Sequence, residues 1–284
     1  MKSKLQKPGS ALGPMESQFF AYCQMEGTET VRAGEVARAF GITPVQEREL
    51  LYRLARDGWI IRLRRGLYLV PPKLPPGGTW MPGEALVLAR LMEDRGGRYQ
   101  LCGPNAFHFW GLEDQVPNRV YAYNNRISGE RKIGVIRFTF IKLADERLGA
   151  VVERETAAGI PLVVGSKART LMDAVYDWKR FGGLPRAYIW IRGELARDPG
   201  LARDLAEVCL RYGNQATARR IGFLLQTSGV SPRILRPLRE SLRSSISLVT
   251  LMPGRPRRGP IDRDWGVIIN DDCQTVSPRK QSEI

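Results

Sequence analysis

The sequence has little of what most metal sites and catalytic triads require. It contains one histidine, His108, and four cysteines that stand far apart without a CxxC pair. Zinc sites use closely spaced cysteines and histidines, so no metal site is expected. His108 lies in the aromatic stretch FHFW, where a packed and hydrogen-bonded histidine is the usual structure. No Walker loop or nucleophile elbow is present. We therefore expect no cofactor and no enzymatic activity.

Long apolar runs are also absent. No stretch approaches the roughly 18 apolar residues of a transmembrane helix, and no signal-peptide pattern precedes the first helix. These absences predict a cytoplasmic protein with reduced thiols and no membrane partner.

The charge balance is the first positive signal. Lys and Arg number 44 against 29 Asp and Glu, which gives a net charge of +15. Folding does not need this excess, and it carries a cost in self-repulsion, so an anionic partner is indicated. Nucleic acid fits best, because most of the excess is Arg in segments with a folded pattern. The alternative is a general preference of some organisms for basic proteins.

Composition divides the chain into four parts. Residues 1–15 are polar and predict a flexible basic arm. Residues 16–72 predict a winged helix-turn-helix, and the Pro/Gly-rich residues 73–83 a linker. Residues 84–284 mix strands and helices and predict a larger α/β domain with a basic helical surface. The fold class is therefore α+β.

The third helix of the winged domain is the best-marked element in the chain. Thr43 is a predicted N-cap, Pro44 suits the first helical position, and Gln46 completes a capping box. Gly58 ends the helix, and two β-like runs follow, separated by the hairpin sequence RLRRG. Two shorter helices are predicted before this third helix, over about 17–25 and 33–40.

The polar face of this helix is the predicted DNA-reading surface. If the leucines at 50, 51 and 54 face inward, the remaining side chains can enter the major groove, where Arg pairs with guanine and Gln with adenine. The predicted DNA contacts are Thr43, Gln46, Arg48, Glu49, Tyr52 and Arg53 on the helix, and Arg62, Arg64 and Arg65 at the hairpin tip. Glu49 could accept from cytosine or pair with Arg53. Winged domains that bind proteins are the alternative.

A second basic surface is predicted on the late helices, where arginines recur at three- and four-residue spacing. Its members are Arg219, Arg220, Arg233, Arg236, Arg239 and Arg243. Such a stripe suits phosphates, but an acidic protein or RNA fits equally well.

A metal-dependent nuclease is the third possibility, because carboxylates cluster in the second half of the chain. The candidates are Asp145, Glu146, Glu153, Glu155, Asp173 and Asp177. Asp173 and Asp177 stand at i, i+4 on an ordinary amphipathic helix, which makes this the least favoured alternative. Ser166 begins that helix as either a cap or part of an anion site.

Four stretches in order carry a resemblance to a known family. They are GWIIRLRRGLYLVPP, YQLCGPNAFHFWGL, IPLVVGSKARTLMDAV and NQATARRIGFLLQTSG, and with the preceding helices they cover about Ser17 to Gly229. In this order and spacing the chain resembles the AbiEi antitoxins of type IV toxin–antitoxin, or abortive infection, systems. The segment after Pro232 and the final residues 271–284 match nothing in that pattern.

The resemblance implies an N-terminal winged DNA-binding domain and a C-terminal α/β domain. It also implies repression of the protein's own operon through inverted repeats in the operator. The partner it implies is a nucleotidyltransferase-like toxin, which the antitoxin counteracts without a stable complex. An antitoxin that acts mainly by contacting its toxin is the alternative.

Overall fold

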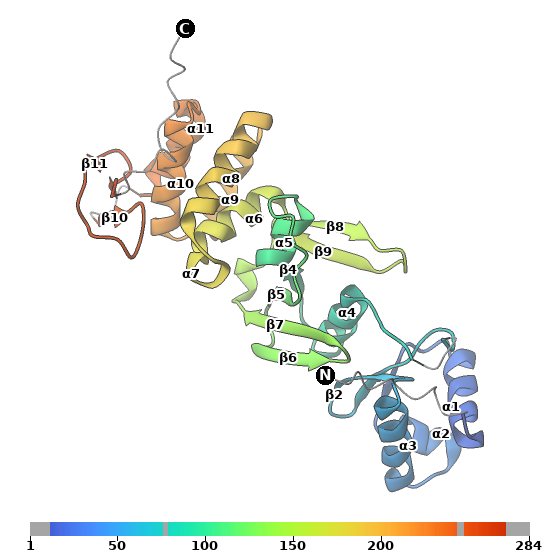
Figure 1. The fold of residues 1–284 in the computed structure, drawn as a ribbon. Helices are drawn as coiled ribbons and strands as arrows, with labels where there is room; N and C mark the ends of the chain where they lie inside the picture. The colour runs from blue at the N-terminus through green and yellow to red at the C-terminus, as the bar shows by residue number, and fades with distance from the viewer. Residues whose placement is uncertain (1–11, 76–78, 243–246, 271–284) are drawn as a thin grey trace, which may run out of the picture.

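A computed structural model describes residues 12–75, 79–242 and 247–270. The chain forms a small N-terminal winged unit and a larger mixed unit, as Figure 1 shows, so the predicted α+β class is confirmed. Residues 1–11 of the predicted arm and the tail after residue 270 lie outside the described residues. No helix within the described ranges is long and apolar enough to cross a membrane.

The winged unit has the element order predicted from the sequence, including a short extended segment at Thr30-Val31 that forms strand β1. It contains α1 (Pro14–Met25), β1 (Thr30–Arg32), α2 (Glu35–Phe40), α3 (Pro44–Arg56), β2 (Ile61–Arg64) and β3 (Leu67–Leu69). The three strands form an antiparallel sheet in the order β1-β3-β2. Phe19, Phe20 and Val36 pack with the α3 leucines into one apolar cluster, which fixes the three helices against each other.

The large unit is built on a six-stranded mixed sheet in the order β6-β7-β5-β4-β9-β8. The strands are β4 (Tyr99–Leu101), β5 (Val120–Asn124), β6 (Gly129–Ile133), β7 (Ile136–Lys142), β8 (Val151–Glu155) and β9 (Pro161–Gly165). Helices α4 (Glu84–Asp94) and α5 (Gly103–Phe109) belong to this part, and a short 3-10 turn spans Asp145–Arg147. Both sheet faces carry buried side chains, as a mixed sheet between helical layers requires.

Strands β6 and β8 were not predicted. β6 reads GERKI and β8 reads VVERE, so charges interrupt the apolar alternation that marks a half-buried strand. Both lie at the two edges of the sheet, where one side of the backbone is unpaired and charged residues are common. Their pairing with β7 and β9 therefore sets their conformation more than their own propensity does.

A bundle of helices follows the sheet. It contains α6 (Lys167–Tyr176), α7 (Trp178–Phe181), α8 (Leu184–Arg197), α9 (Leu201–Tyr212), α10 (Gln215–Thr227) and α11 (Pro232–Glu240). A small sheet of β10 (Val249–Thr250), β11 (Ile261–Asp262) and β12 (Val267–Ile268) covers α10. Trp265 is fully buried there, and a Cβ on Gly222 would lie 2.1 Å from its ring, so only glycine permits this approach.

The winged unit and the large unit share one apolar cluster. Ile61, Leu63 and Leu67 of the β2–β3 hairpin pack with Leu91 of α4 and Phe138 of β7. The second part of the predicted linker contacts the winged unit. The backbone N–H of Trp80 donates a hydrogen bond to the Gly58 carbonyl at 2.9 Å. The hairpin is therefore a structural joint between the two units.

Candidate nucleic-acid interface

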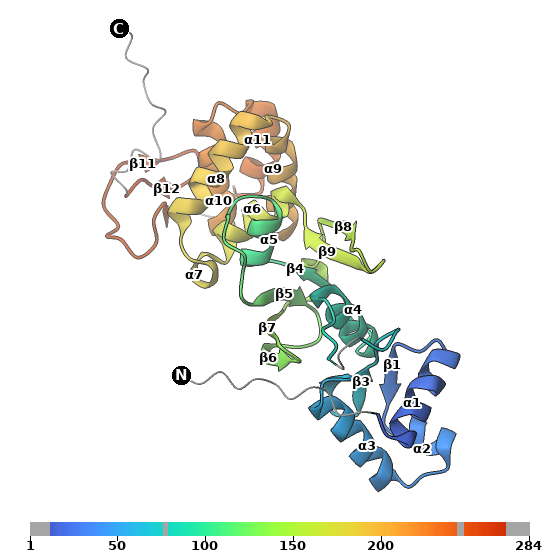
Figure 2. The same cartoon turned by 45° about the vertical axis from the view of Figure 1, so that its right-hand side comes forward.

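Helix α3 presents a polar face to solvent on the side away from its leucines. Leu50, Leu51 and Leu54 are almost fully buried, as predicted, whereas the Tyr52 side chain is 63% exposed and Arg48 is exposed. Figures 1 and 2 both show α3 at the lower end of the winged unit, and the whole unit lies far from the helical bundle. This face is open to a large partner such as a DNA groove.

Sequence reasoning missed Glu47, which sets the angle between α2 and α3. Its side chain is 3% exposed, and its carboxylate accepts hydrogen bonds from the N–H groups of Gly34, Val36 and Ala37 at 2.7–3.1 Å. The carboxylate thus caps the N-terminus of α2, where the unpaired N–H groups and the helix dipole favour a negative charge. The signal was present, since position 47 shares one helix face with Leu50, Leu51 and Leu54.

The capping box of α3 is confirmed, and it restricts what Gln46 can read. The Gln46 side-chain oxygen accepts from the Thr43 N–H at 2.8 Å and lies 2.9 Å from the Thr43 hydroxyl oxygen. A bidentate contact with adenine needs both the oxygen and the nitrogen of the amide. In this conformation only the side-chain NH2 of Gln46 remains for a base. The Thr43 hydroxyl in turn accepts a hydrogen bond from the backbone N–H of Gln46.

Ion pairs occupy some of the predicted α3 contacts and leave others open. Arg53 pairs with Glu16 of α1 at 3.0 Å, so the suggested Glu49–Arg53 pair is not formed. Arg48 and Glu49 have no hydrogen bond or ion pair with any described residue, and Tyr52 has no hydrogen bond within that set. Arg48 and Tyr52 are therefore the side chains most available for a ligand.

The wing arginines differ in the same way. Arg62 and Arg65 are exposed, but Arg64 is turned toward the large unit. Its guanidinium donates two hydrogen bonds to the buried carboxylate of Asp94, at 2.6 and 2.7 Å, and these bonds hold the pKa of Asp94 below its ordinary value. Arg64, predicted to contact DNA from the hairpin tip, is thus paired with Asp94 in this structure.

The prediction of a second basic surface is wrong for Arg219 and Arg220, because both side chains are buried. Their relative exposures are 5% and 7%, because α10 packs against neighbouring elements on all sides. Arg219 donates to the Trp265 carbonyl at 2.8 Å, and Arg220 to the Thr250 carbonyl at 3.0 Å. Burial lowers the pKa of both guanidinium groups. These arginines hold the C-terminal sheet on the bundle.

The remaining members of that surface lie on α11. Arg236 pairs with Glu240 at 2.9 Å, and Arg239 lies over the Trp265 ring and pairs with Asp264 at 3.2 Å. Arg233 is exposed and has no hydrogen bond or ion pair inside the described ranges. Arg243 lies outside the described residues.

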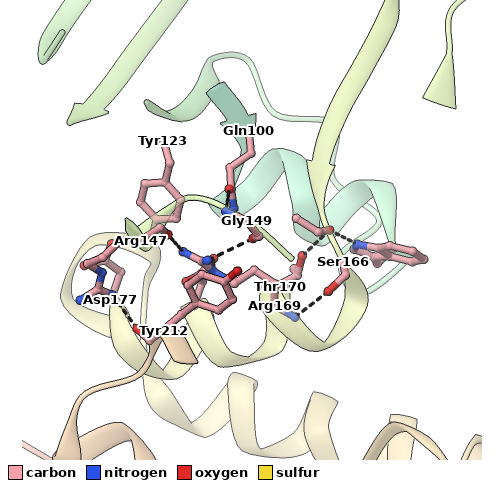
Figure 3. Close-up of polar contacts among 12 residues, drawn as sticks. Gln100, Tyr123, Arg147, Gly149, Ser166, Arg169, Thr170, Asp177 and Tyr212 are labelled. Carbon is pink, nitrogen blue, oxygen red and sulfur yellow. Dashed lines mark hydrogen bonds and ion pairs between the residues drawn. The ribbon is translucent and has the colours of Figure 1, made fainter. Parts of the chain in front are cut away.

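Two of the carboxylates considered for a nuclease, Asp173 and Asp177, belong to a structural cluster that Figure 3 shows in part. Arg169 is fully buried; its Nε donates to both Asp173 oxygens, and its other nitrogens donate to the Gly149 and Arg147 carbonyls. Asp177 accepts from the Tyr123 hydroxyl at 2.6 Å. The described part of the chain contains no group of three His, Cys, Asp or Glu side chains able to hold a metal ion. Ser166 caps α6 through the Arg169 N–H.

Comparison with known proteins gives a match over the winged unit. Residues 26–71, from the end of α1 through β3, match the family model described as "Transcriptional regulator, AbiEi antitoxin". The winged unit of this chain is therefore similar to the regulator domain of AbiEi antitoxins. The resemblance inferred from the sequence is thus confirmed there, and the three later stretches quoted for it lie beyond the matched residues.

A likeness of fold extends over most of the chain. The crystal structure of the RV2827C protein from Mycobacterium tuberculosis matches with a TM-score of 0.58, at 15% identity, over 92% of this chain and 94% of that one. At this identity the match shows a shared fold over the winged unit and the large unit, and no more. No curated protein matches the sequence.

Proposed function

We propose that the chain is a DNA-binding antitoxin of a type IV toxin–antitoxin system. It represses its own operon in the cytoplasm and counteracts a nucleotidyltransferase-like toxin encoded beside it. The family match over residues 26–71 supports the regulator part of this proposal. The net charge of +15 supports a polyanionic partner.

The observation that carries the proposal is the division of α3 into two faces. Three buried leucines fix the helix on the winged core, and Arg48 and Tyr52 extend from the opposite side without intramolecular hydrogen bonds to described residues. In a winged domain this face enters the major groove, where Arg48 can donate two hydrogen bonds to guanine. Arg62 and Arg65 of the wing then lie on phosphates or in the minor groove.

A gel-shift assay on the DNA upstream of the gene tests this function. We expect a shift that prefers this DNA over a scrambled duplex of the same length and weakens steeply between about 50 and 200 mM salt. A reporter behind the same promoter should be repressed when the protein is supplied. Equal shifts on both duplexes, with no repression, would contradict the operator proposal.

A second candidate is an antitoxin that acts mainly by contacting its toxin. The supporting observation is a groove of about 740 Å³ between α9 and α11, whose lining includes the apolar Leu210 and Ile234 with Arg203, Arg233 and Glu207. Such a basic-rimmed apolar groove suits a protein surface with acidic residues. Co-purification with the neighbouring gene product, lost in an Arg233→Glu variant and retained in Arg48→Ala, would favour this mode. For Arg236 and Arg239, the other described arginines of α11, we still propose binding to phosphates or to an acidic protein.

A further inference from the structure

The β6–β7 hairpin of the large unit lies directly beside the wing. Its turn is Gly134-Val135, with Gly134 at φ 58°, and a Cβ on Gly134 would lie 3.2 Å from Cδ1 of Ile61 in β2. Figures 1 and 2 show this hairpin just beyond the wing, on the same side of the molecule as α3. A duplex that lies along α3 and continues past the wing would therefore meet the hairpin.

Two cations face each other across this hairpin. Lys132 of β6 and Arg137 of β7 are directly opposite in the antiparallel register, and both are exposed. Neither has a hydrogen bond or ion pair with any residue that the structure describes. Like charges at directly opposed positions, about 4.5–5.5 Å apart at Cβ, destabilise a sheet. The pair is unfavourable within the chain alone and becomes favourable when an anion lies over it.

The surroundings leave this positive charge uncompensated. Glu130, the acidic residue of β6, is already paired with Arg119 on the same face of the sheet, and Arg119 also donates to Thr139 at 3.2 Å. A hollow of about 280 Å³ is lined by Arg119, Glu130, Lys132 and Arg137 among others. With Arg131, four cations therefore line this hollow against one carboxylate.

The chemistry of the hairpin selects the phosphate backbone rather than bases. The hairpin aromatics, Phe138 and Phe140, are buried in the core, so no exposed ring is available there to stack an unpaired base. Lysine and arginine on a rigid strand suit the phosphates of a duplex, where they fix position without reading sequence. The hairpin is rigidly coupled to the wing, because Ile133 and Ile61 belong to one apolar cluster.

We propose that the β6–β7 hairpin is a second DNA-contacting element, in which Lys132 and Arg137 bind phosphates next to the segment read by α3. The inference rests on the proposed DNA binding of α3 and extends it to the large unit. The bound DNA is then longer than the winged unit alone could cover. The hairpin adds affinity and orientation, and α3 supplies the sequence preference.

The test uses the full chain with Lys132→Gln and Arg137→Gln combined. On a long operator duplex we expect affinity to fall about tenfold near physiological salt, and the slope of log affinity against log salt to decrease by about 2. The loss should be the same for scrambled DNA, so the ratio between the two stays unchanged. On a short duplex limited to the α3 half-site, variant and wild type should bind alike.

The matched control is Arg258→Gln with Arg263→Gln, beside the small C-terminal sheet that covers α10. Both side chains are exposed, and the variant changes the net charge by the same amount at this sheet, away from α3. The control should keep the wild-type salt slope. Thermal unfolding checks folding, and the hairpin variant should be at least as stable as the wild type, because a like-charge pair is removed.

Two outcomes would overturn the inference. One is wild-type affinity and salt slope for the hairpin variant on the long duplex, and the other is an equal loss in the control variant. If the wild type binds operator and scrambled DNA equally while the hairpin variant still lowers the salt slope, operator recognition fails and the hairpin contact stands. If the hairpin variant lost the binding of an acidic protein while its DNA binding stayed unchanged, that result would also contradict a DNA contact at the hairpin.

Discussion

Arg64 and Asp94 form a two-bond ion pair between the wing and the large unit, with Nε–Oδ2 at 2.6 Å and the second nitrogen–oxygen contact at 2.7 Å. The same carboxylate lies 3.3 Å from a guanidinium nitrogen of Arg32 in β1. Because the Asp94 side chain is only 3% exposed, the pair is part of the joint that orients the winged unit. It also removes Arg64 from the set of arginines available to DNA.

Replacing Asp94 by Asn should loosen this joint. The variant keeps the shape of the side chain but leaves two guanidinium groups without their carboxylate, so we expect the free energy of unfolding to fall by about 1–3 kcal/mol in urea titrations. Asp114→Asn is the control, because Asp114 is exposed and has no ion pair with another described residue. Equal stability of the Asp94 variant and the wild type would contradict the role of the pair.

The same pair predicts a dependence on acidity. The pKa of Asp94 is lowered in the folded state, so its stabilising contribution is present above the unfolded value near pH 4 and is lost as the pH falls through the lower folded value. The stability difference between wild type and Asp94→Asn should therefore be constant from about pH 5 to 7 and shrink below about pH 4. A difference that grows toward low pH would contradict this assignment.

Glu47 should matter for folding of the winged unit although it contacts no ligand. Glu47→Ala leaves the α2 N–H groups without their acceptor in a buried place, which predicts a loss of about 1–3 kcal/mol in the free energy of unfolding. Glu47→Gln keeps one acceptor oxygen and should lose less. Glu49→Ala is the matched control on the exposed face, and it should stay within about 0.5 kcal/mol of the wild type.

Asp173 should give the opposite dependence on pH. Burial raises its pKa to about 6, against the lowering effect of Arg169. Because the folded state then binds this proton more tightly than the unfolded state, the contribution of Asp173 to stability should fall as pH rises from about 4 to 6, by on the order of 2–3 kcal/mol.

Urea titrations of Asp173→Asn measure this effect. The variant cannot titrate at this position, so its stability relative to wild type should rise from pH 4 to 6 and then level off. Exposed Asp204→Asn should show no such trend. Parallel stability curves for wild type and Asp173→Asn over this range would show that the carboxylate stays ionised.

The wing arginines should separate into two classes by their effect on DNA binding. Arg62→Gln and Arg65→Gln should each lower the salt slope of DNA affinity by about 1, the value for one lost phosphate contact. Arg64→Gln should leave that slope unchanged and lower the free energy of unfolding, because its partner is Asp94. Equal effects of all three on the salt slope would show that Arg64 leaves Asp94 when DNA binds.

Local signals made the winged unit predictable. The bounds of α3 are set by neighbouring residues, namely the Thr43 cap, Pro44, Gln46 and Gly58. The local sequence alone therefore predicts where α3 begins and ends. The leucine stripe then defines which face is exposed. The choice of the exposed face as a DNA surface followed from the same pattern.

The errors come from long-range packing. The sequence pattern placed Arg219 and Arg220 on one helix but could not show that α10 is covered on every side. Arg64 sits in a hairpin that is basic by composition, yet its partner Asp94 is 30 residues away. β6 has few β-forming residues and depends on its pairing with β7.

The central claim is that α3 reads DNA through its exposed face, and Arg48→Ala tests it most directly. Fluorescence anisotropy on the upstream operator and on a scrambled duplex should show a loss of about 1–3 kcal/mol in operator affinity, with a much smaller change on the scrambled duplex. The preference for the operator should therefore shrink, while urea titrations show an unchanged fold. Retained operator preference in Arg48→Ala, and in Arg48→Ala combined with Tyr52→Ala, would contradict the account.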